Sequence, residues 1–540
     1  MNRRNFIKKG SLAGIISTLS LSNVAAAPSL NENNSLTKDD FELNETTIDS
    51  LQELMQNGQL SARQLTKMYL KRIEKFDKSG PKLNAIIELN PDALTIATQM
   101  DEERKTGKVR GKLHGIPVLV KDNINTADKM QTTAGALALQ GNKVSEDAFI
   151  VKKLREAGAV ILGKTNLSEW ANFRSTRSSS GWSSRGGQTK NPYILDRSPS
   201  GSSSGSGTAV SANLCVVAIG TETNGSIIAP SSYNGLVGLK PTVGLLSRRG
   251  IIPISKTQDT AGPMTRNVTD AAILLSCLAA VDEKDAITKE SVSKSQKDYT
   301  SYLNKDAISG KKIGIEKSFL TGHEAVVGLY KNAIEKFKEL GAEIVEIGLL
   351  EELKNIGGAS YTVLQYEFKD GINNYLAMAN AKVKTLQDVI DFNKANDKAT
   401  MPYFKQEILE SSQKTTDLEN ASYKEALAKT LSSRKIITDL MARNKLNAII
   451  GTSYGIPSCI DLFNGDYSSG FYFASPAAMA GYPHITVPMG KIHELPIGLS
   501  IMAGAYQEPM VLSLAYAFEQ ATLHRTTPKF IKSSNFSSGI

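Results

Sequence analysis

The sequence has 540 residues, long enough for two domains by length alone, and a formal net charge of +9. No basic tract is interleaved with aromatic residues, so nucleic-acid binding has little support. The 3 Cys are too few for a disulfide framework, and no group of His, Cys and acidic residues has metal-ligand spacing, so we expect neither a metal nor a cofactor.

The first 27 residues have the features of an export signal. Arg3 and Arg4 form a twin-arginine motif in a basic start, a mildly apolar stretch runs from Gly10 to Leu21, and residues 25–27 provide a small-residue cleavage site. The apolar stretch is too short and too rich in Ser and Gly for a stable membrane span. We therefore expect a Tat-type signal peptide at residues 1–27, contact with the bacterial Tat export machinery, and a periplasmic or secreted protein without stable membrane insertion.

Strand and helix patterns follow this start. Residues 28–45 are rich in Asn and Ser and are predicted to be a flexible lead-in. Apolar residues recur at helical spacing from Thr46 to Ile73, with Ser61 as a candidate N-cap. Further along the chain, apolar strands are predicted at 116–120, 159–162, 447–451, 485–489 and 496–502, and a helix at 148–157. This alternation indicates an α/β fold, in which a large mixed β-sheet is surrounded by α-helices.

Three segments hold a candidate base, proton relay and nucleophile without histidine. The predicted strand at 116–120 is followed by Lys121, a Ser/Gly run at 200–207 includes Ser202, and Ser226 lies in the sequence GTETNGSI. A serine hydroxyl is a poor nucleophile until a base takes its proton, and none of the 5 His lies beside either serine segment. A buried lysine can be that base, because desolvation disfavours its charged form and lowers its pKa toward neutrality.

These segments resemble the amidase signature family, which works through a Ser–cis-Ser–Lys triad. Matched position by position, the resemblance assigns Lys121 as the base, Ser202 as the relay serine and Ser226 as the nucleophile. Further similar blocks stand at 235–242, 259–264 and 481–488. The resemblance implies one amidase domain over residues 46–528 and a cis peptide bond between Gly201 and Ser202.

The resemblance also implies acyl transfer. Neutral Lys121 takes a proton from Ser202, which takes one from Ser226 as Ser226 attacks the amide carbonyl. Water then clears the acyl-enzyme.

The turn before Ser226 is the expected oxyanion site. Backbone N–H groups from Thr223, Asn224, Gly225 and Ser226 are expected to bind the developing negative charge. The family has glycine where this chain has Asn224, a residue that tolerates similar dihedral angles better than most. The family's usual Asp is Glu222 here, and its usual Arg after the nucleophile segment is replaced by Ile228.

The expected function is an exported serine amidase that hydrolyses carboxylic amides or the C-terminal amides of short peptides to acid and ammonia. The GTETNGSI sequence and residues 180–189 look most like the peptide amidase branch. Three alternatives stay open: a general acylamide amidohydrolase, a binding protein on an inactive amidase fold, and an amidotransferase A-type subunit. The last of these needs cytosolic aminoacyl-tRNA, which an export signal disfavours.

Two remaining stretches contain none of the family's chemical blocks. Residues from about 285 to 440 are rich in Lys, Glu and Asn and helical in period, with a β-α-β pattern near Ile313, Leu329 and Val345. We expect them to form a peripheral insertion that packs over the core and shapes the substrate entrance. Residues 529–540 are predicted to be a C-terminal tail. The sequence does not indicate an oligomeric state.

Overall fold

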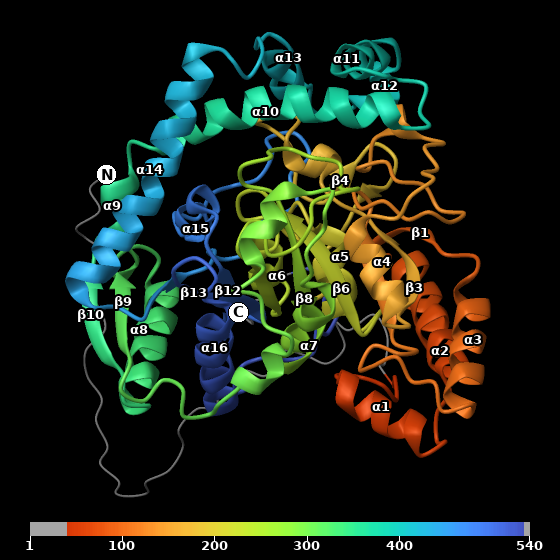
Figure 1. Cartoon of the computed structure of the whole chain (residues 1–540), viewed down its shortest axis with the longest axis horizontal. Coiled ribbons are helices and arrows are strands. Elements are labelled where there is room, and N and C mark those ends of the chain that lie inside the picture. Colours follow the sequence, from red (N-terminus) through yellow and green to blue (C-terminus); the bar gives the residue numbers. More distant parts are fainter. Residues whose placement is uncertain (1–39, 534–540) are drawn as a thin grey trace, which may run out of the picture.

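Eleven strands form one mixed β-sheet at the centre of the protein, in the part that the computed structural model describes, residues 40–533 (Figure 1). In order across the sheet the strands are β1 (Ile86–Leu89), β3 (Val160–Thr165), β2 (Pro117–Lys121), β6 (Val217–Glu222), β8 (Thr260–Thr265), β7 (Val237–Lys240), β12 (His484–Ile492), β13 (Leu495–Met502), β11 (Ala448–Thr452), β9 (Lys312–Glu316) and β10 (Glu343–Ile347). A separate short hairpin joins β4 (Trp182–Ser183) to β5 (Gly187–Gln188). The expected fold class is confirmed, whereas the expected export signal at 1–27 lies outside the described residues.

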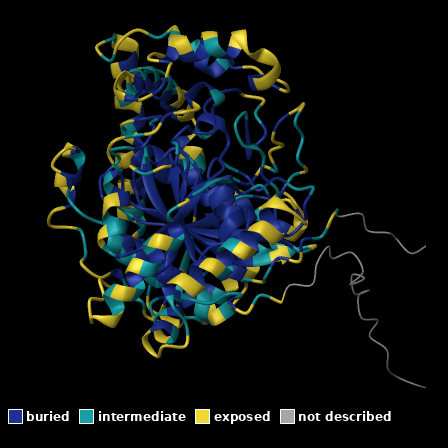
Figure 2. Cartoon of the chain, turned by 90° about the vertical axis from the view of Figure 1, so that its right-hand side faces the viewer, coloured by how far each residue is buried: buried dark blue, intermediate teal, exposed yellow. Residues whose placement is uncertain are grey.

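Sixteen α-helices surround the sheet in this part of the chain. They are α1 (Ile48–Gln56), α2 (Ala62–Ile73), α3 (Ala93–Lys105), α4 (Phe149–Glu156), α5 (Ser204–Ser211), α6 (Ile228–Tyr233), α7 (Val268–Leu278), α8 (Glu324–Glu339), α9 (Leu349–Leu353), α10 (Gly357–Met378), α11 (Leu386–Ala395), α12 (Asp397–Thr400), α13 (Glu407–Gln413), α14 (Ala421–Asn444), α15 (Ala474–Ala480) and α16 (Glu508–Thr522). Figure 2 shows that exposed residues gather on the outer helices while the sheet is buried. None of the helices within residues 40–533 has both the length and the apolar character to cross a membrane.

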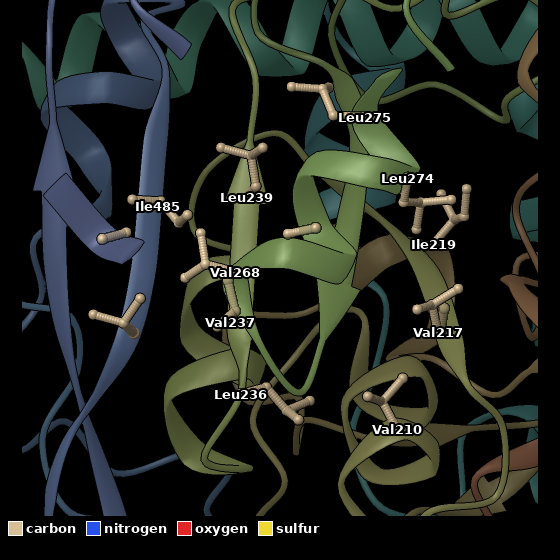
Figure 3. Close-up of a cluster of buried hydrophobic side chains, with 14 of the residues drawn as sticks. Val210, Val217, Ile219, Leu236, Val237, Leu239, Val268, Leu274, Leu275 and Ile485 are labelled. Carbon is tan, nitrogen blue, oxygen red and sulfur yellow. The ribbon is translucent and has the colours of Figure 1, made fainter. Parts of the chain in front are cut away.

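The middle of the sheet is a continuous apolar core. Val217 and Ile219 of β6, Leu239 of β7, Leu275 of α7 and Ile485 of β12 are all fully buried and belong to one cluster (Figure 3). Every residue of β2 and β6 is buried, as expected for strands that are covered on both faces. The apolar runs that predicted these strands from the sequence therefore reflect burial at the centre of the sheet.

The direction of two central strands places the candidate residues together. β2 pairs in parallel with β6, so the carboxyl ends of both strands meet at one edge of the sheet. Lys121 is the last residue of β2, and Glu222 is the last residue of β6. The turn that carries Ser226 follows β6 directly and leads into α6. This edge is therefore where the candidate site forms.

The predicted start of α2 is confirmed. The Ser61 side chain accepts a hydrogen bond from the Gln64 N–H, and the Gln64 side chain accepts one from the Ser61 N–H. Such a reciprocal capping box satisfies two of the N–H groups that a helix start leaves without intrahelical partners.

The expected flexible lead-in is wrong for its described part, residues 40–45. Leu43 is buried in the main core, and the carboxylate of Glu45 accepts hydrogen bonds from the guanidinium of Arg525 at 2.7 and 2.8 Å. Burial of an apolar side chain and a two-point ion pair hold this segment on the domain, which begins before residue 46.

The expected C-terminal tail is likewise wrong for residues 529–533. Phe530 is buried, and its ring lies 4.8 Å from that of Phe76 between centroids. The Leu195 N–H donates a hydrogen bond to the carbonyl oxygen of Ile531 at 2.8 Å. A single buried aromatic side chain thus extends the domain past residue 528.

The stretch 285–440 is only partly a peripheral insertion. Its β-α-β pattern corresponds to β9, α8 and β10, and β9 pairs in parallel with β11, so these strands complete the central sheet instead of lying outside it. Ile313 and Ile315 are buried, so their backbone N–H and C=O groups need hydrogen-bond partners, and neighbouring strands supply them. Helices α10 to α13 do form an outer layer, seen at the top of Figure 1.

Candidate active site

Lys121 is fully buried at the end of β2 and is surrounded by hydroxyl groups. Its Nζ lies 2.7 Å from Ser202 Oγ, 3.0 Å from Ser203 Oγ, 2.9 Å from Thr221 Oγ1 and 3.2 Å from the Thr221 carbonyl oxygen. Burial lowers the pKa of Lys121 to about 7, while the more distant charges of Asp259 and Glu222 act in the opposite direction. A lysine with this pKa is largely uncharged above neutral pH and has a lone pair to accept a proton.

The hydrogen bonds around Lys121 fit a neutral amine. The Ser203 hydroxyl can donate to the Thr221 carbonyl oxygen at 3.1 Å, which leaves its oxygen as an acceptor for Lys121. A neutral amine donates twice and accepts once. With Ser203 and Thr221 accepting its two N–H groups, the lone pair remains for the Ser202 hydroxyl. In this arrangement the Ser202 hydroxyl can donate its proton to the Lys121 nitrogen.

Ser202 lies in a loop just before α5, and the Gly201–Ser202 peptide bond is cis, as the family resemblance implies. The residue is fully buried. The Ser168 N–H donates to its carbonyl oxygen at 3.1 Å, and Lys121 is the one hydrogen-bond partner of its hydroxyl among the described residues. The hydroxyl is therefore free to pass a proton to the lysine.

Ser203 has no assigned catalytic role, yet its hydrogen bonds join both serine segments. Its N–H donates to the carbonyl oxygen of Ser226 at 3.1 Å, and its hydroxyl accepts from the Thr221 N–H at 3.2 Å. It therefore holds the loop with Ser202 against the end of β6 and against the turn with Ser226. Its neighbour Ser204 closes the loop by donating to the Ser200 carbonyl oxygen at 2.7 Å.

Ser226 follows Gly225, whose φ of +82° is a conformation that glycine adopts without strain. A Cβ atom at position 225 would lie 2.0 Å from the hydroxyl oxygen of Tyr472, so the position has no room for a side chain. The Ser226 side chain has no hydrogen-bond partner among the described residues. Ser226 is 8% exposed and lines a cavity, so its hydroxyl is open to a bound substrate.

The turn that precedes Ser226 is fixed from several sides. The hydroxyl of Tyr472 lies 2.9 Å from both the carbonyl and the side-chain oxygen of Asn224, and Ser475 donates to the same side chain at 3.1 Å. After the turn, the Glu222 carboxylate accepts the Ile227 N–H at 2.8 Å and the N–H of the next residue at 3.0 Å. The backbone amides expected to bind an oxyanion are therefore preorganised.

Asp259 supports the other end of this turn. It accepts a hydrogen bond from the Thr223 hydroxyl and from the N–H groups of Ile254 and Ser255 at 2.8 and 2.9 Å. Burial raises its pKa to about 6, although these hydrogen bonds favour the ionised form.

The cavity beside Ser226 has a volume of about 390 Å³, within the usual range for small-molecule sites. Its wall combines the loop before Ser202, the turn Thr223–Gly225, aromatic residues and one leucine from the outer helical layer. The lining residues are Ala171, Asn172, Phe173, Ser180, Ser200, Gly201, Thr223, Asn224, Gly225, Ser226, Ala229, Ile254, Leu364, Tyr454, Asp466, Ser468 and Tyr472.

Two buried histidines have structural surroundings. His114 has its Nε2 at 2.9 Å from the Met100 carbonyl oxygen, and His484 has its Nε2 at 2.6 Å from Ser500 Oγ. Burial, followed by the charge of Lys240, lowers the pKa of His484 to about 3. Within residues 40–533, no three or more His, Cys, Asp or Glu side chains are grouped so as to hold a metal ion.

The structure brings Lys121, Ser202 and the turn 223–226 together, and the sequence analysis did not identify several of the residues that support them. Thr221 stands inside a recognised segment and could have been found there. Asp259 begins a block whose only signal in the sequence is its similarity to the family. Tyr472 gives no sequence signal, because the loop that carries it is more than two hundred residues further along the chain.

Comparison with known proteins agrees with this geometry. The family model described as Amidase matches residues 64–512. A probable amidase of Arabidopsis thaliana is 40% identical over 504 residues, which cover 91% of this chain and 93% of the relative. The X-ray structure of native peptide amidase from Stenotrophomonas maltophilia has a TM-score of 0.87 and 46% identity, covering 91% of this chain and 99% of that one. The A-type subunit of glutamyl-tRNA(Gln) amidotransferase from Caldanaerobacter subterraneus subsp. tengcongensis is 35% identical over 503 residues, covering 91% of this chain and 99% of the relative.

Proposed function

Because this chain belongs to the amidase family of amidohydrolases, we propose that it is a serine amidase that cleaves the C-terminal amide of short peptides through an acyl-enzyme on Ser226. The observation that carries the proposal is the contact between Lys121 and Ser202 at 2.7 Å, next to a cavity lined by Ser226. A buried lysine with a pKa of about 7 supplies the base that a serine nucleophile needs in the absence of a catalytic histidine.

The first half of the reaction forms the acyl-enzyme. As Ser226 Oγ attacks the amide carbonyl carbon, its proton passes to Ser202, whose own proton passes to the neutral Lys121. The carbonyl oxygen gains negative charge, which the backbone N–H groups of the turn 223–226 stabilise. Removing one such donor typically costs ~3 kcal/mol of transition-state stabilisation.

The second half releases the products. The C–N bond breaks, and the proton held by Lys121 returns through Ser202 to the leaving nitrogen, so that ammonia departs. Water then attacks the ester carbonyl with the same groups acting as base, and the acid leaves from a regenerated Ser226.

A peptide amide is favoured as substrate by two features. The peptide amidase of Stenotrophomonas maltophilia is similar over 91% of this chain at 46% identity. The cavity, at about 390 Å³, has room for a dipeptide-sized acyl group, and its wall includes Phe173, Leu364 and Tyr472, which suit an uncharged side chain.

Ammonia release from three classes of amide tests the substrate class. Purified mature protein is given peptide amides, short aliphatic amides and aryl amides at matched concentrations, and Ser226→Ala protein serves as the blank. Turnover of peptide amides at least as fast as that of simple amides supports the proposal. Turnover of simple amides alone would reduce the function to that of a general acylamide amidohydrolase. An inactive wild type would favour a binding protein.

We also propose that the protein acts outside the cytoplasm, after export through the Tat system. The support is the twin-arginine start with Arg3 and Arg4, the apolar stretch to Leu21 and the small residues at 25–27. Peptide and xenobiotic amides are met in that compartment. A glutamyl-tRNA(Gln) amidotransferase A subunit is 35% identical to this chain. Export nevertheless disfavours that role, because aminoacyl-tRNA is cytosolic.

A further inference from the structure

The cavity beside Ser226 has one carboxylate in its wall, Asp466, and no described lysine, arginine or histidine lines it. Asp466 lies in the loop between β11 and α15. The mechanism does not use it, since the proton path runs from Ser226 through Ser202 to Lys121. The only formal negative charge on the described wall of this substrate cavity is therefore left without an assigned role.

Asp466 is held in place without being neutralised. The Ser180 N–H donates to its two carboxylate oxygens at 3.0 and 3.2 Å, and the Ser180 hydroxyl donates to it as well. It forms no ion pair with any cationic side chain in the part of the chain that the structure describes. Asp466 is exposed to solvent, so its carboxylate stays accessible to a positively charged group.

Ser180 connects Asp466 to the catalytic loop. A Cβ atom on Gly201 would lie 3.0 Å from the Ser180 hydroxyl oxygen, so Ser180 sits against the residue before Ser202. Ser180 therefore connects Asp466 to the loop that carries Ser202, by hydrogen bonds on one side and by packing on the other. A group bound at Asp466 would lie in the same cavity as the reacting amide.

Tyr454 adds an aromatic ring to the same part of the wall. Tyr454 and Asp466 line the same cavity, and burial, followed by the charge of Asp466, raises the pKa of Tyr454 to about 12. The Tyr454 ring packs edge-on against Tyr472 at 5.5 Å between centroids, and Tyr472 in turn contacts Asn224. A carboxylate and an aromatic ring in the wall of one cavity are a combination that attracts an ammonium group.

We propose that Asp466 and Tyr454 form a subsite for a positively charged nitrogen on the acyl part of the substrate, and that the N-terminal ammonium of a short peptide amide is the group it takes. This inference rests on the proposed amidase function. The cation would pair with the carboxylate of Asp466 and orient the acyl chain from its far end. The enzyme would then prefer peptide amides with a free N-terminus.

Two substrates that differ by one group test this subsite. Glycyl-L-leucinamide carries an ammonium group where propanoyl-L-leucinamide carries a methyl group, and an α-amino group with a pKa of about 7.7–8.0 is mostly protonated at neutral pH. Wild type should have the higher kcat/KM for the glycyl compound, measured by ammonia release. In Asp466→Asn, which keeps the acceptor for Ser180, the ratio of the two kcat/KM values should fall about tenfold or more. A ratio that stays at the wild-type value would overturn the subsite.

A matched control separates the loss of the Asp466 charge from a change in the structure of its loop. Asp461 lies in the same loop, is outside the cavity wall and accepts the N–H groups of Phe463 and Asn464. Asp461→Asn should keep the wild-type ratio, and an equal fall in both variants would contradict the proposal. Since both substrates are measured on one sample, a partly unfolded variant does not change the ratio.

Binding decides the subsite independently of turnover. Calorimetric titration of Ser226→Ala protein should give a lower Kd for glycyl-L-leucinamide than for propanoyl-L-leucinamide, and adding Asp466→Asn should remove the difference. If wild type released no ammonia from either compound, the amidase proposal would fail while this binding difference still supported the subsite. Equal or undetectable binding of both compounds would refute the subsite.

Discussion

Lys121 is the residue on which the proposed chemistry depends. It is fully buried, forms no ion pair with any carboxylate among the described residues, and is surrounded by hydroxyl and carbonyl groups. Burial without a paired charge disfavours the ammonium form, which is why its pKa falls to about 7. The same burial that makes a lysine costly in a core makes it a base near neutral pH.

The pH dependence of kcat/KM should report this lysine. Lys121 accepts a proton only in its neutral form, and its pKa is lowered, so activity should be present above about pH 7 and should fall as the pH drops below it. An initial-rate profile across neutral pH on a substrate with no titrating group checks this. A rate that is flat across pH 7 would mean that no group with this pKa limits the reaction.

Replacing Lys121 by arginine should abolish turnover while keeping a positive charge. Arginine cannot deprotonate in a protein, so the Lys121→Arg variant has no base for Ser202. We expect kcat to fall by about a thousandfold or more. Circular dichroism and the thermal unfolding midpoint control for folding. Near-normal turnover in a folded variant would make Lys121 an electrostatic or structural residue.

The sequence was enough to propose the reacting residues but not most of the groups that hold them in place. Lys121, Ser202 and Ser226 each stand in a short segment with a recognisable order of residues. Tyr472 contacts Asn224 only because a distant loop returns to this edge of the sheet. A contact of that kind depends on the packing of the whole domain, which local pattern does not encode.

At the scale of elements, the outer helix α10 contributes directly to the cavity. Leu364 of this helix lines the cavity together with Ser226, and it is 8% exposed. This fits the expectation that the helical part of the stretch 285–440 shapes the substrate entrance. The neighbouring Val363 instead packs in a separate cluster with Tyr423 of α14.

Shortening Leu364 should widen the substrate range. In Leu364→Ala the cavity gains volume. The kcat/KM for amides of bulky amino acids, divided by the kcat/KM for alaninamide, should therefore rise roughly tenfold. A few methylene groups in a pocket are worth about this much discrimination between substrates. Val363→Ala removes a buried side chain from the same helix without touching the cavity and should leave the ratio unchanged. An equal change in both variants would show that helix packing, and not cavity size, sets the preference.

Local periodicity predicts the elements better than their partners. The N-cap at Ser61 and the strands β2 and β3 depend on neighbouring residues, and the structure confirms them. The strands β9 and β10 are visible as a pattern in the sequence, but their place in the central sheet is not. β9 joins the central sheet by pairing with β11, where Ile313 lies opposite Ala448, and strand pairing over such a separation leaves no local signal.

At the scale of the whole molecule, the proposed export depends on the first residues of the chain. Changing Arg3 and Arg4 together to lysine keeps the charge but removes the twin-arginine motif. We expect the variant to accumulate in the cytoplasm of a bacterial host, whereas the unchanged chain is found in the periplasmic fraction in a shorter form. Cell fractionation with detection of the mature protein checks this. Equal distribution of both chains would refute Tat-dependent export.

The two ends of the described chain also show how far one domain extends. Leu43 and Phe530 are both buried in the main core, although they flank the limits expected from sequence similarity. Sequence similarity marks only the segments that family members share, whereas the hydrophobic core also includes buried apolar side chains outside those segments.

Covalent labelling of the nucleophile tests the central claim most directly. Wild-type protein is treated with a serine-directed fluorophosphonate and analysed by intact mass and peptide mapping. We predict one label per molecule, on Ser226, with loss of amidase activity in proportion to labelling, and no label on Ser226→Ala. Labelling of another residue that abolishes activity, or a fully active protein that takes no label, would contradict a serine acyl-enzyme mechanism at this site.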